Sequence, residues 1–267
     1  MVTRDRPELA RRAITCFLAQ TWPHRELVIV DDGDRSYDDL VASYDDPRIR
    51  YVRLPSSPSQ RLGALRNASQ DLARGEYRVQ WDDDEWYHPE RIERQMRPIL
   101  DEGWDASLLQ YTLMHCDTPA LAMHPFRTGL PFGTPGSLLH RRTRARYPNR
   151  ARGEDSAFLR SVFLRQRVAR LGRGESHLLI RCFHGDNTWN ASHFTERLWS
   201  GPRARFHWLK ARYLDRDLYR HAAFDLEPRE RIAFHEFLDV SRRLGLLRHL
   251  PSTAGGALEA LEVGNLP

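Results

Sequence analysis

Paired cysteines, lysines and long apolar runs are all scarce in this chain of 267 residues, and each absence excludes a class of protein. Three cysteines stand far apart at positions 16, 116 and 182 without a CxxC pair, so we expect neither a disulfide framework nor structural zinc. No apolar run approaches the roughly 20 residues of a membrane-spanning helix, and the opening MVTRDRPE lacks the apolar region of a signal peptide. We therefore expect a cytoplasmic protein, with contact to the inner face of the membrane left open.

Arginine supplies nearly all of the positive charge, because Lys210 is the only lysine among 41 basic residues. The acidic residues number 36, which leaves a formal net charge of +5. Eleven arginines fall between residues 141 and 173, where the only acids are Glu154 and Asp155. This run is either the solvated face of helices or a surface for an anionic partner, such as a lipid-linked pyrophosphate, a phosphorylated glycan or the membrane. Nucleic acid is not expected, because no nucleic-acid-binding module is present.

Short apolar runs alternate with segments of helical periodicity over the first hundred residues. Residues 27–30 form a buried-strand pattern that stops at an acidic turn, and further strand patterns occupy 49–54 and 77–81. Helical patterns follow Pro7, span 59–74 and follow Pro89. The alternation predicts an α/β fold with a largely parallel central sheet flanked by helices. Residues 1–2 are short for a first strand, so that strand is either truncated or begins further upstream.

Acidic residues follow two of the predicted strands, at 31–32 and at 82–84. Ligands of open α/β sheets bind beyond the carboxyl ends of strands, so both turns are expected at one crevice. In the stretch QWDDDEW, alternate residues of an extended chain project to the same side, which lets Asp82 and Asp84 act together while Asp83 points elsewhere. Such carboxylates suit Mg²⁺ or Mn²⁺ together with substrate phosphates. Alone, the same run also fits a solvated turn that caps the next helix.

The segments VIVDDG, RNAS, ARGEYRVQWDDDEWYHPERI and RGEDSAFL occur in the order that is typical of the family 2 glycosyltransferases of the GT-A fold. The chain resembles that family over roughly residues 3–190. The resemblance implies that Thr3 and Asp5 lie near the nucleotide base, and that Asp31 or Asp32 contacts the nucleoside. It also places Arg66 near the donor.

The same resemblance assigns roles to the acidic motifs. It matches Asp82-Asp83-Asp84 to the family's DxD motif, with Asp82 toward the ribose or the metal and Asp84 on the metal. In the Glu154-Asp155 pair, Asp155 is the implied general base. His184 stands where such enzymes place a metal-binding histidine, although a histidine with a purely structural role would give the same sequence pattern. Trp81 and Trp86 either wall the site or belong to the core, and residues 133–137 either shape the acceptor side or simply connect two elements.

These observations predict a GT-A catalytic domain at 1–194, with a nucleotide-sugar half at 1–103 and an acceptor half at 104–194. A helical extension with a loose tail is expected at 195–267. The predicted function is metal-dependent, inverting transfer of a sugar from a UDP-, GDP- or dTDP-linked donor to a glycan or lipid-linked hydroxyl acceptor, in glycan or cell-surface polysaccharide synthesis. Two alternatives stay open: a non-catalytic nucleotide-sugar or glycan binder, and a nucleotidyltransferase. The latter predicts a glycine-rich phosphate loop, which TRDRPE does not supply.

Overall fold

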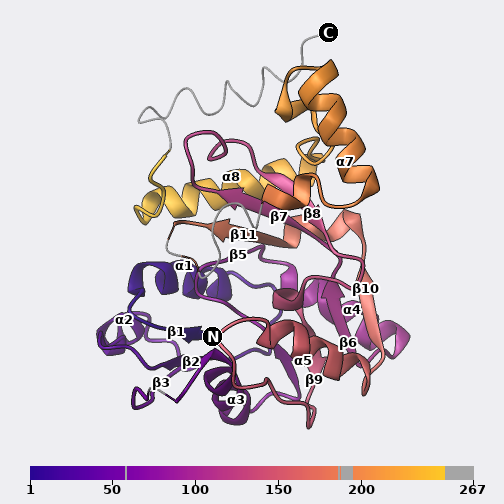
Figure 1. Ribbon diagram of the computed structural model, residues 1–267. Helices are drawn as coiled ribbons and strands as arrows, with labels where there is room; N and C mark the ends of the chain where they lie inside the picture. Colours follow the sequence, from indigo (N-terminus) through magenta and orange to yellow (C-terminus); the bar gives the residue numbers. More distant parts are fainter. Residues whose placement is uncertain (58, 186, 188–194, 250–267) are drawn as a thin grey trace.

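The computed structural model describes residues 1–57, 59–185, 187 and 195–249, and three sheets organise this part of the chain (Figure 1). Sheet A is entirely parallel, in the order β1–β2–β3. Its strands are β1 (Val2–Thr3), β2 (Leu27–Asp31) and β3 (Ile49–Arg53). All five residues of β2 are buried, which explains why this strand reads as a continuous apolar run. The short first strand does form, but it covers only the last two residues of β2.

The other two sheets are mixed. Sheet B has the order β10–β6–β9–β4, with β9 antiparallel to both of its neighbours. Its strands are β4 (Tyr77–Val79), β6 (Ala106–Leu109), β9 (Leu139–Arg141) and β10 (Val168–Leu171). Sheet C has the order β5–β11–β7–β8. Its strands are β5 (Trp86–Tyr87), β7 (Tyr111–Cys116), β8 (Phe126–Gly129) and β11 (Leu179–Phe183). Parallel pairing therefore dominates the first half of the chain and alternates with antiparallel pairing in the second.

Five α-helices accompany these sheets as far as residue 163. They are α1 (Pro7–Leu18), α2 (Asp38–Ala42), α3 (Leu62–Leu72), α4 (Arg91–Glu102) and α5 (Glu154–Phe163). Helix α1 begins with a proline in its first turn, where the missing N–H removes no helical hydrogen bond. Helix α4 ends at Gly103, whose φ of 70° gives the left-handed cap that glycine adopts at little cost. Two short 3₁₀ segments, η1 (Pro135–Ser137) and η2 (Arg173–Leu178), connect strands.

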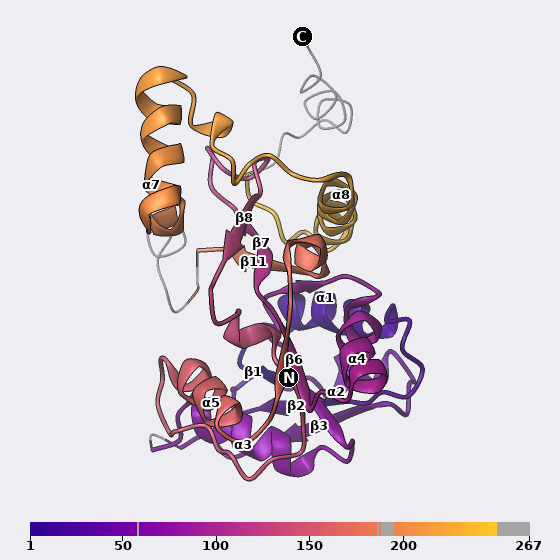
Figure 2. The same cartoon turned by 90° about the vertical axis from the view of Figure 1, so that its right-hand side faces the viewer.

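The C-terminal region is helical but interrupted. Its elements are η3 (Glu196–Leu198), α7 (Pro202–Leu209), η4 (Lys210–Leu214), η5 (Leu218–Arg220) and α8 (Pro228–Arg243). In Figure 2, α7 stands away from the rest of the molecule, while α8 lies across sheet C and near α1. Phe234 and Phe237 of α8 belong to the same core cluster as Phe17 of α1 and Trp86. The predicted tail from residue 250 lies outside the described residues, and the domain boundary at 194 stays a prediction.

The exposed fractions of the tryptophans and cysteines show which of these side chains belong to the core. Trp81 and Trp86 are 4% and 3% exposed, so both belong to the core. All three cysteines are buried and free. Among the described residues, no helix is long and apolar enough to cross a bilayer.

The arginine-rich run does not form one unpaired surface. Arg141 pairs with Glu76 at 2.8 Å, Arg146 with Asp71 at 2.6 Å, and Arg173 with Glu227 at 2.9 Å. These partners come from three different segments of the chain. These three arginines of the run therefore tie surface segments together.

Candidate functional site

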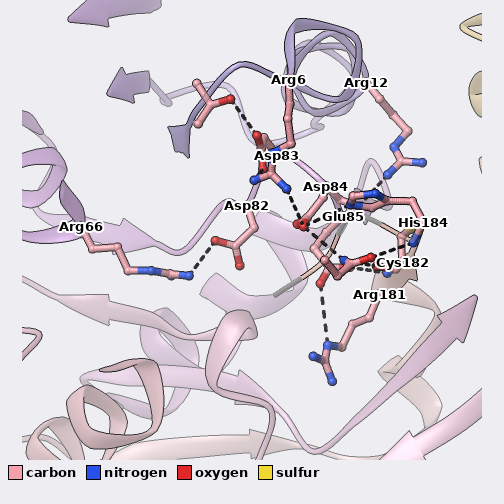
Figure 3. Close-up of polar contacts among 12 residues, drawn as sticks. Arg6, Arg12, Arg66, Asp82, Asp83, Asp84, Glu85, Arg181, Cys182 and His184 are labelled. Atoms are coloured by element: carbon pink, nitrogen blue, oxygen red, sulfur yellow. Dashed lines mark hydrogen bonds and ion pairs between the residues drawn. The ribbon is translucent and has the colours of Figure 1, made fainter. Parts of the chain in front are cut away.

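The two acidic turns meet as the sequence predicts. Asp31 ends β2, and the loop of residues 80–85 follows β4. Figure 3 shows the acidic side chains of this loop and the arginines around them. Thr3, at the end of β1, links them: its hydroxyl donates to Asp83 at 2.7 Å, and Thr3 pairs with Asp31 in the sheet. The carboxyl ends of neighbouring strands thus supply one crevice.

The aspartates after β2 are held differently from each other. Asp31 is fully buried and accepts hydrogen bonds from the Tyr51 hydroxyl at 2.7 Å and from the Gly33 amide at 2.8 Å. Asp32 is 2% exposed, and its Oδ1 atom has no hydrogen-bond partner among the described residues. Its other oxygen lies 3.7 Å from the exposed guanidinium of Arg4. A buried carboxylate oxygen without a donor is costly, so Asp32 is the better placed of the two to receive a ligand hydroxyl.

Thr3 and Asp5 are engaged within the protein. Besides Asp83, the Thr3 hydroxyl contacts the Tyr37 hydroxyl at 2.9 Å. The carboxylate of Asp5 accepts from the amides of Asp34 and Arg35, both at 2.8 Å, and it does not cap α1. Asp5 has a φ of 52°, the left-handed region that aspartate tolerates better than most residues. Both side chains therefore position the turn after β2 and the acidic loop against each other.

Arg66 of α3 joins the acidic loop to the start of α5. Its guanidinium lies 3.1 Å from Asp82 and 3.3 Å from Glu154, and its side chain is 12% exposed. Gln80 donates to the other oxygen of Asp82 at 2.9 Å. Asn67, the next residue along α3, exchanges hydrogen bonds with the backbone of Tyr147, which fixes the segment before α5. The Arg66 guanidinium thus brings together two sequence motifs that lie 72 residues apart, at Asp82 and Glu154.

A second arginine balances the middle of the acidic loop. Arg6 lies 2.7 Å from Asp83 and 3.3 Å from Asp84. Burial, together with the neighbouring Asp84 and Asp82 carboxylates, raises the pKa of Asp83, although Arg6 opposes this shift. Asp83 is 1% exposed and hydrogen-bonded to Thr3, so its side chain points into the protein.

Asp84 faces the segment that follows β11. Its Oδ2 lies 3.7 Å from His184 Nε2 and 3.5 Å from the side-chain nitrogen of Asn187. Burial opposes its ionisation, but the adjacent His184 imidazole and the charge of Arg6 outweigh burial and lower the pKa of Asp84. Asp84 therefore carries a negative charge next to an imidazole. The adjacent residues 186 and 188–194 lie outside the described part of the chain.

This donor set suits a hard divalent cation in part. Asp84 and His184 are neighbours, whereas Asp82 is turned toward Arg66, so the three predicted ligands do not converge to a common point. Among the described residues, ligand atoms within 4.8 Å of one another occur in a set of three only at His88, Glu90 and His177, none of which belongs to the acidic loop. In the structure, Arg6 and Arg66 supply positive charge to the three aspartate side chains.

Glu154 and Asp155 occupy distinct environments at the start of α5. Glu154 is 3% exposed, and burial raises its pKa even though Arg66 is adjacent. Asp155 is partly exposed, and its Oδ1 accepts from the Ser156 amide at 2.7 Å. The more accessible of the two carboxylates is therefore Asp155.

Sequence reasoning missed several residues of the site. Arg6 holds the acidic loop, the Tyr37 hydroxyl accepts from the Arg6 amide at 2.7 Å, and Arg12 donates to the Asp84 carbonyl at 2.6 Å. Their partners are distant in sequence, so no local pattern could identify them. The loop at 133–137 does approach the site: a Cβ on Gly136 would come within 3.4 Å of Asp82 Oδ2.

Comparison with known proteins places this site in a family. The chain is 38% identical over 95 residues to WcaA of Escherichia coli K12, which is named as a colanic acid biosynthesis glycosyl transferase. The matched region covers 34% of this chain and 33% of WcaA. It is 33% identical over 102 residues to EpsH of Bacillus subtilis 168, named as a glycosyltransferase, covering 37% of this chain and 28% of EpsH. The matched region thus spans about a third of either relative.

Solved structures share the fold at low sequence identity. TarS 1–349 of S. aureus in complex with UDP-GlcNAc has a TM-score of 0.55 at 16% identity, over 92% of this chain and 82% of that one. The mannosyltransferase PcManGT of Pyrobaculum calidifontis, in complex with GDP-Man and Mn²⁺, has a TM-score of 0.50 at 14% identity. The match covers 98% of this chain and 77% of PcManGT. The fold is the GT-A fold, as the sequence predicted. The profile of "Glycosyl transferase family 2" matches residues 1–154, more than half of the sequence, and the chain belongs to that family.

Proposed function

We propose that this chain is an inverting glycosyltransferase that moves a sugar from a nucleotide diphosphate sugar to a hydroxyl acceptor, in glycan or cell-surface polysaccharide synthesis. The observation that carries the proposal is the meeting of Asp32, the loop of residues 82–84, Arg66 and the start of α5 at the carboxyl ends of β2 and β4. In this proposal Asp32 serves the nucleoside, Asp84 the cation and Asp155 the acceptor.

The donor would lie along the strand ends. Asp32 receives a hydroxyl of the nucleoside, since its buried Oδ1 lacks a donor among the described residues. Asp82 faces the sugar-phosphate region with Arg66 behind it. A positive group so close to the departing diphosphate stabilises charge that develops in the transition state, which is where such an interaction accelerates transfer.

The acceptor hydroxyl must lose its proton as it attacks the anomeric carbon. We assign this role to Asp155, because it is partly exposed and Glu154 is buried against Arg66. Glu154 then acts as a positioning residue that holds the Arg66 guanidinium between α3 and α5.

Asp84 would hold Mg²⁺ or Mn²⁺, with His184 and, after a side-chain rotation, Asp82 as further ligands. When bound, the ion supplies positive charge against the diphosphate leaving group. Arg6 would leave Asp84 on loading, while its contact with the buried Asp83 is retained. The Mn²⁺ in the PcManGT complex supports this proposal by fold similarity.

A thermal-shift panel tests donor and metal together. UDP-, GDP- and dTDP-sugars are added with and without Mn²⁺ to the wild type, to Asp84→Asn and to Asp101→Asn, an exposed control at the end of α4. Selective binding raises the melting temperature by mass action. We expect one nucleotide to stabilise the wild type and the control only with Mn²⁺, and to leave Asp84→Asn unchanged. A shift that survives in Asp84→Asn would contradict the metal assignment.

Turnover separates the proposed enzyme from a binder. A non-catalytic nucleotide-sugar binder would show the same thermal shift but would release no nucleoside diphosphate with any acceptor. A nucleotidyltransferase would instead require a nucleoside triphosphate and release pyrophosphate. Coupled assays for the two products, run on the same sample, distinguish the three functions.

The acceptor is proposed to be lipid-linked, with peripheral contact at an anionic membrane. The segment from α7 to η5 supports this, since Phe206, Tyr213 and Leu214 are 65%, 64% and 77% exposed beside Arg205 and Arg212. Exposed aromatic and basic residues together suit a bilayer interface. Co-sedimentation should require anionic liposomes and weaken in Phe206→Ser/Leu214→Ser. The control Leu164→Ser, 79% exposed on another element, should bind as the wild type does. Binding independent of anionic lipid would contradict the proposal.

A further inference from the structure

Two histidines and a glutamate gather where β5 leads into α4. His88 and Glu90 lie between these two elements, and His177 belongs to η2. One potential ligand atom of each side chain lies within 4.8 Å of the other two. The rings of His88 and His177 meet edge to face, with their centroids 4.9 Å apart. Nothing in the proposed transfer reaction uses these three side chains.

Hydrogen bonds to the backbone hold the cluster in place. Strands β5 and β11 pair antiparallel, and just beyond their ladder the His88 amide donates to the Leu178 carbonyl at 3.2 Å. This pairing brings His88 alongside His177, the residue before Leu178. The side chain of Gln20 donates to the His88 carbonyl at 2.8 Å, and Glu90 is the N-cap residue of α4. Each member of the cluster is therefore attached to a regular element, which favours a preorganised site.

His177 is buried with one ring nitrogen unpaired. The residue is 3% exposed, and its Nδ1 atom has no hydrogen-bond partner among the described residues. A buried polar atom without a partner is costly, so a ligand at this position would stabilise the protein. Burial lowers the pKa of His177 to about 4 and also lowers the pKa of His88. Both rings are therefore neutral at pH 7, and the neutral imidazole is the form that binds metal ions.

The other two side chains can turn toward an ion at little cost. The Glu90 amide donates to His88 Nδ1 at 3.2 Å, a long hydrogen bond that metal binding at either ring nitrogen would end. The Glu90 side chain is 45% exposed and lies 3.3 Å from Arg94, so this ion pair contributes little. Arg94 also lies 3.6 Å from Glu175 and keeps that partner when Glu90 moves.

We propose that His88, Glu90 and His177 bind one Zn²⁺ ion, with water in the fourth position. Two imidazoles and a carboxylate are typical ligands of this ion, and the set needs no cysteine. Zn–N distances of about 2.0–2.1 Å place the ligand atoms of a tetrahedral ion about 3.3 Å apart, so the three side chains close by at most about 1.5 Å. The proposal does not depend on the transfer reaction and shares no ligand with the Mg²⁺ or Mn²⁺ site.

The ion joins the start of α4 to η2, at one end of the β5–β11 pair. The acidic loop precedes β5 and His184 follows β11, so the contact of Asp84 with His184 lies at the other end of the same pair. A metal held by His88 and His177 therefore fixes the two strands from which Asp84 and His184 extend. Its role is structural, and its loss would loosen the pairing beside the acidic loop.

Zinc binding is measured in the Asp84→Asn chain, so that the ion proposed for the acidic loop does not contribute. Isothermal titration with ZnCl₂ should give one ion per chain with a Kd of about 1 µM or tighter. Adding His88→Gln or Glu90→Gln should weaken binding by at least about 100-fold, because each removes a ligand. Glu93→Gln is the matched control, since Glu93 carries the same charge in the first turn of α4 and also pairs with an arginine four residues on. It should keep the Kd within a few-fold.

Cobalt gives a readout that a purely structural role of these side chains would not change. Co²⁺ in a four-coordinate site absorbs visible light far more strongly than the octahedral aqueous ion. CoCl₂ should produce this absorption in the Asp84→Asn chain, and ZnCl₂ should remove it by displacement. Adding Glu90→Gln or His177→Gln should abolish the absorption, whereas His24→Gln, at an exposed histidine, should leave it unchanged.

Two outcomes would overturn the proposal. One is the absence of stoichiometric Zn²⁺ binding in an Asp84→Asn chain that unfolds cooperatively. The other is a Kd for Zn²⁺ that is the same in His88→Gln and Glu90→Gln as in their background, which would place the ion elsewhere. If the buried His177→Gln variant does not fold, these two variants at partly exposed positions decide the question.

Discussion

Individual side chains in the acidic loop differ sharply although their sequence is uniform. Asp82 pairs with Arg66, Asp83 with Arg6 and Thr3, and Asp84 with Arg6 and His184. Closely spaced carboxylates repel, and each arginine reduces that repulsion. The division of partners explains how one short loop can contain both a structural aspartate and two that remain accessible to a ligand.

Asp155→Asn should reduce turnover by about 10²-fold or more, because it removes the proposed proton acceptor, while donor binding stays within a few-fold of wild type. Glu154→Gln should instead weaken donor binding, because it releases Arg66. Steady-state rates and donor titrations of both variants check this assignment. Equal loss of turnover and normal donor binding in both variants would mean that the roles are shared or exchanged.

His115 should make the protein sensitive to acid. Its ring is 1% exposed beside Phe237 and contacts the Ala122 carbonyl at 3.1 Å. Burial lowers its pKa to about 4, and Arg12 adds to this shift while Asp117 opposes it. Below the unfolded value of about 6.5, the unfolded chain therefore binds a proton that the folded chain rejects, and stability from this group falls with pH.

His115→Gln removes that titration. The stability advantage of wild type over the variant should shrink by up to about 3 kcal/mol between pH 7 and pH 4. Chemical denaturation of both proteins at several pH values measures the difference and cancels groups common to both, including the raised carboxylates of the acidic loop. A constant difference across this range would contradict the prediction.

Among the elements, α8 packs into the core although it lies near the end of the described chain. Phe237 is fully buried, and Arg12 of α1 lies over its ring at 5.3 Å and donates to Ser241 at 3.1 Å. Glu230, at the first turn of α8, forms a buried ion pair with Arg127 of β8. Because Arg12 also holds the Asp84 carbonyl, α8 supports the acidic loop through a single intermediate residue.

Phe237→Ala should destabilise the fold by about 3–5 kcal/mol, the usual effect of deleting a buried aromatic ring. Ile232→Ala, on the same helix but 56% exposed, should change stability by less than about 1 kcal/mol. Urea denaturation of both variants checks this contrast. Similar values for the two would mean that α8 does not complete the core.

For the whole molecule, we expect the residues before 195 to depend on the C-terminal region for their fold. A chain truncated after residue 194 lacks Phe234 and Phe237, which share a cluster with Phe17 and Trp86. It should lose cooperative unfolding, as measured by calorimetry, and co-expression of 195–267 should restore it in part. A truncated chain that melts cooperatively near the wild-type temperature would support an independent domain at 1–194.

Much of this arrangement could be predicted from the sequence because its signals are local. Asp31, Asp82 and Glu154 follow strands or open a helix, and their order matched a family pattern that the comparisons confirm. Arg6, Tyr37 and Tyr147 could not be identified, since their importance comes from partners 31 to 80 residues away. The mixed pairing around β9 was also missed, because a three-residue strand between loops has no clear periodicity.

The buried Cys182 gives the protein an internal reporter of local opening. Its amide binds Glu85, the last acid of the loop, and burial raises the pKa of its thiol far above neutrality. Cys16 and Cys116 are likewise buried with raised pKa values, at about 11 and about 12. A thiol reagent can therefore react only when the surrounding structure separates, and its rate measures how often that occurs. The alkylation rate of each cysteine would therefore measure the rate of local opening around it without any introduced label.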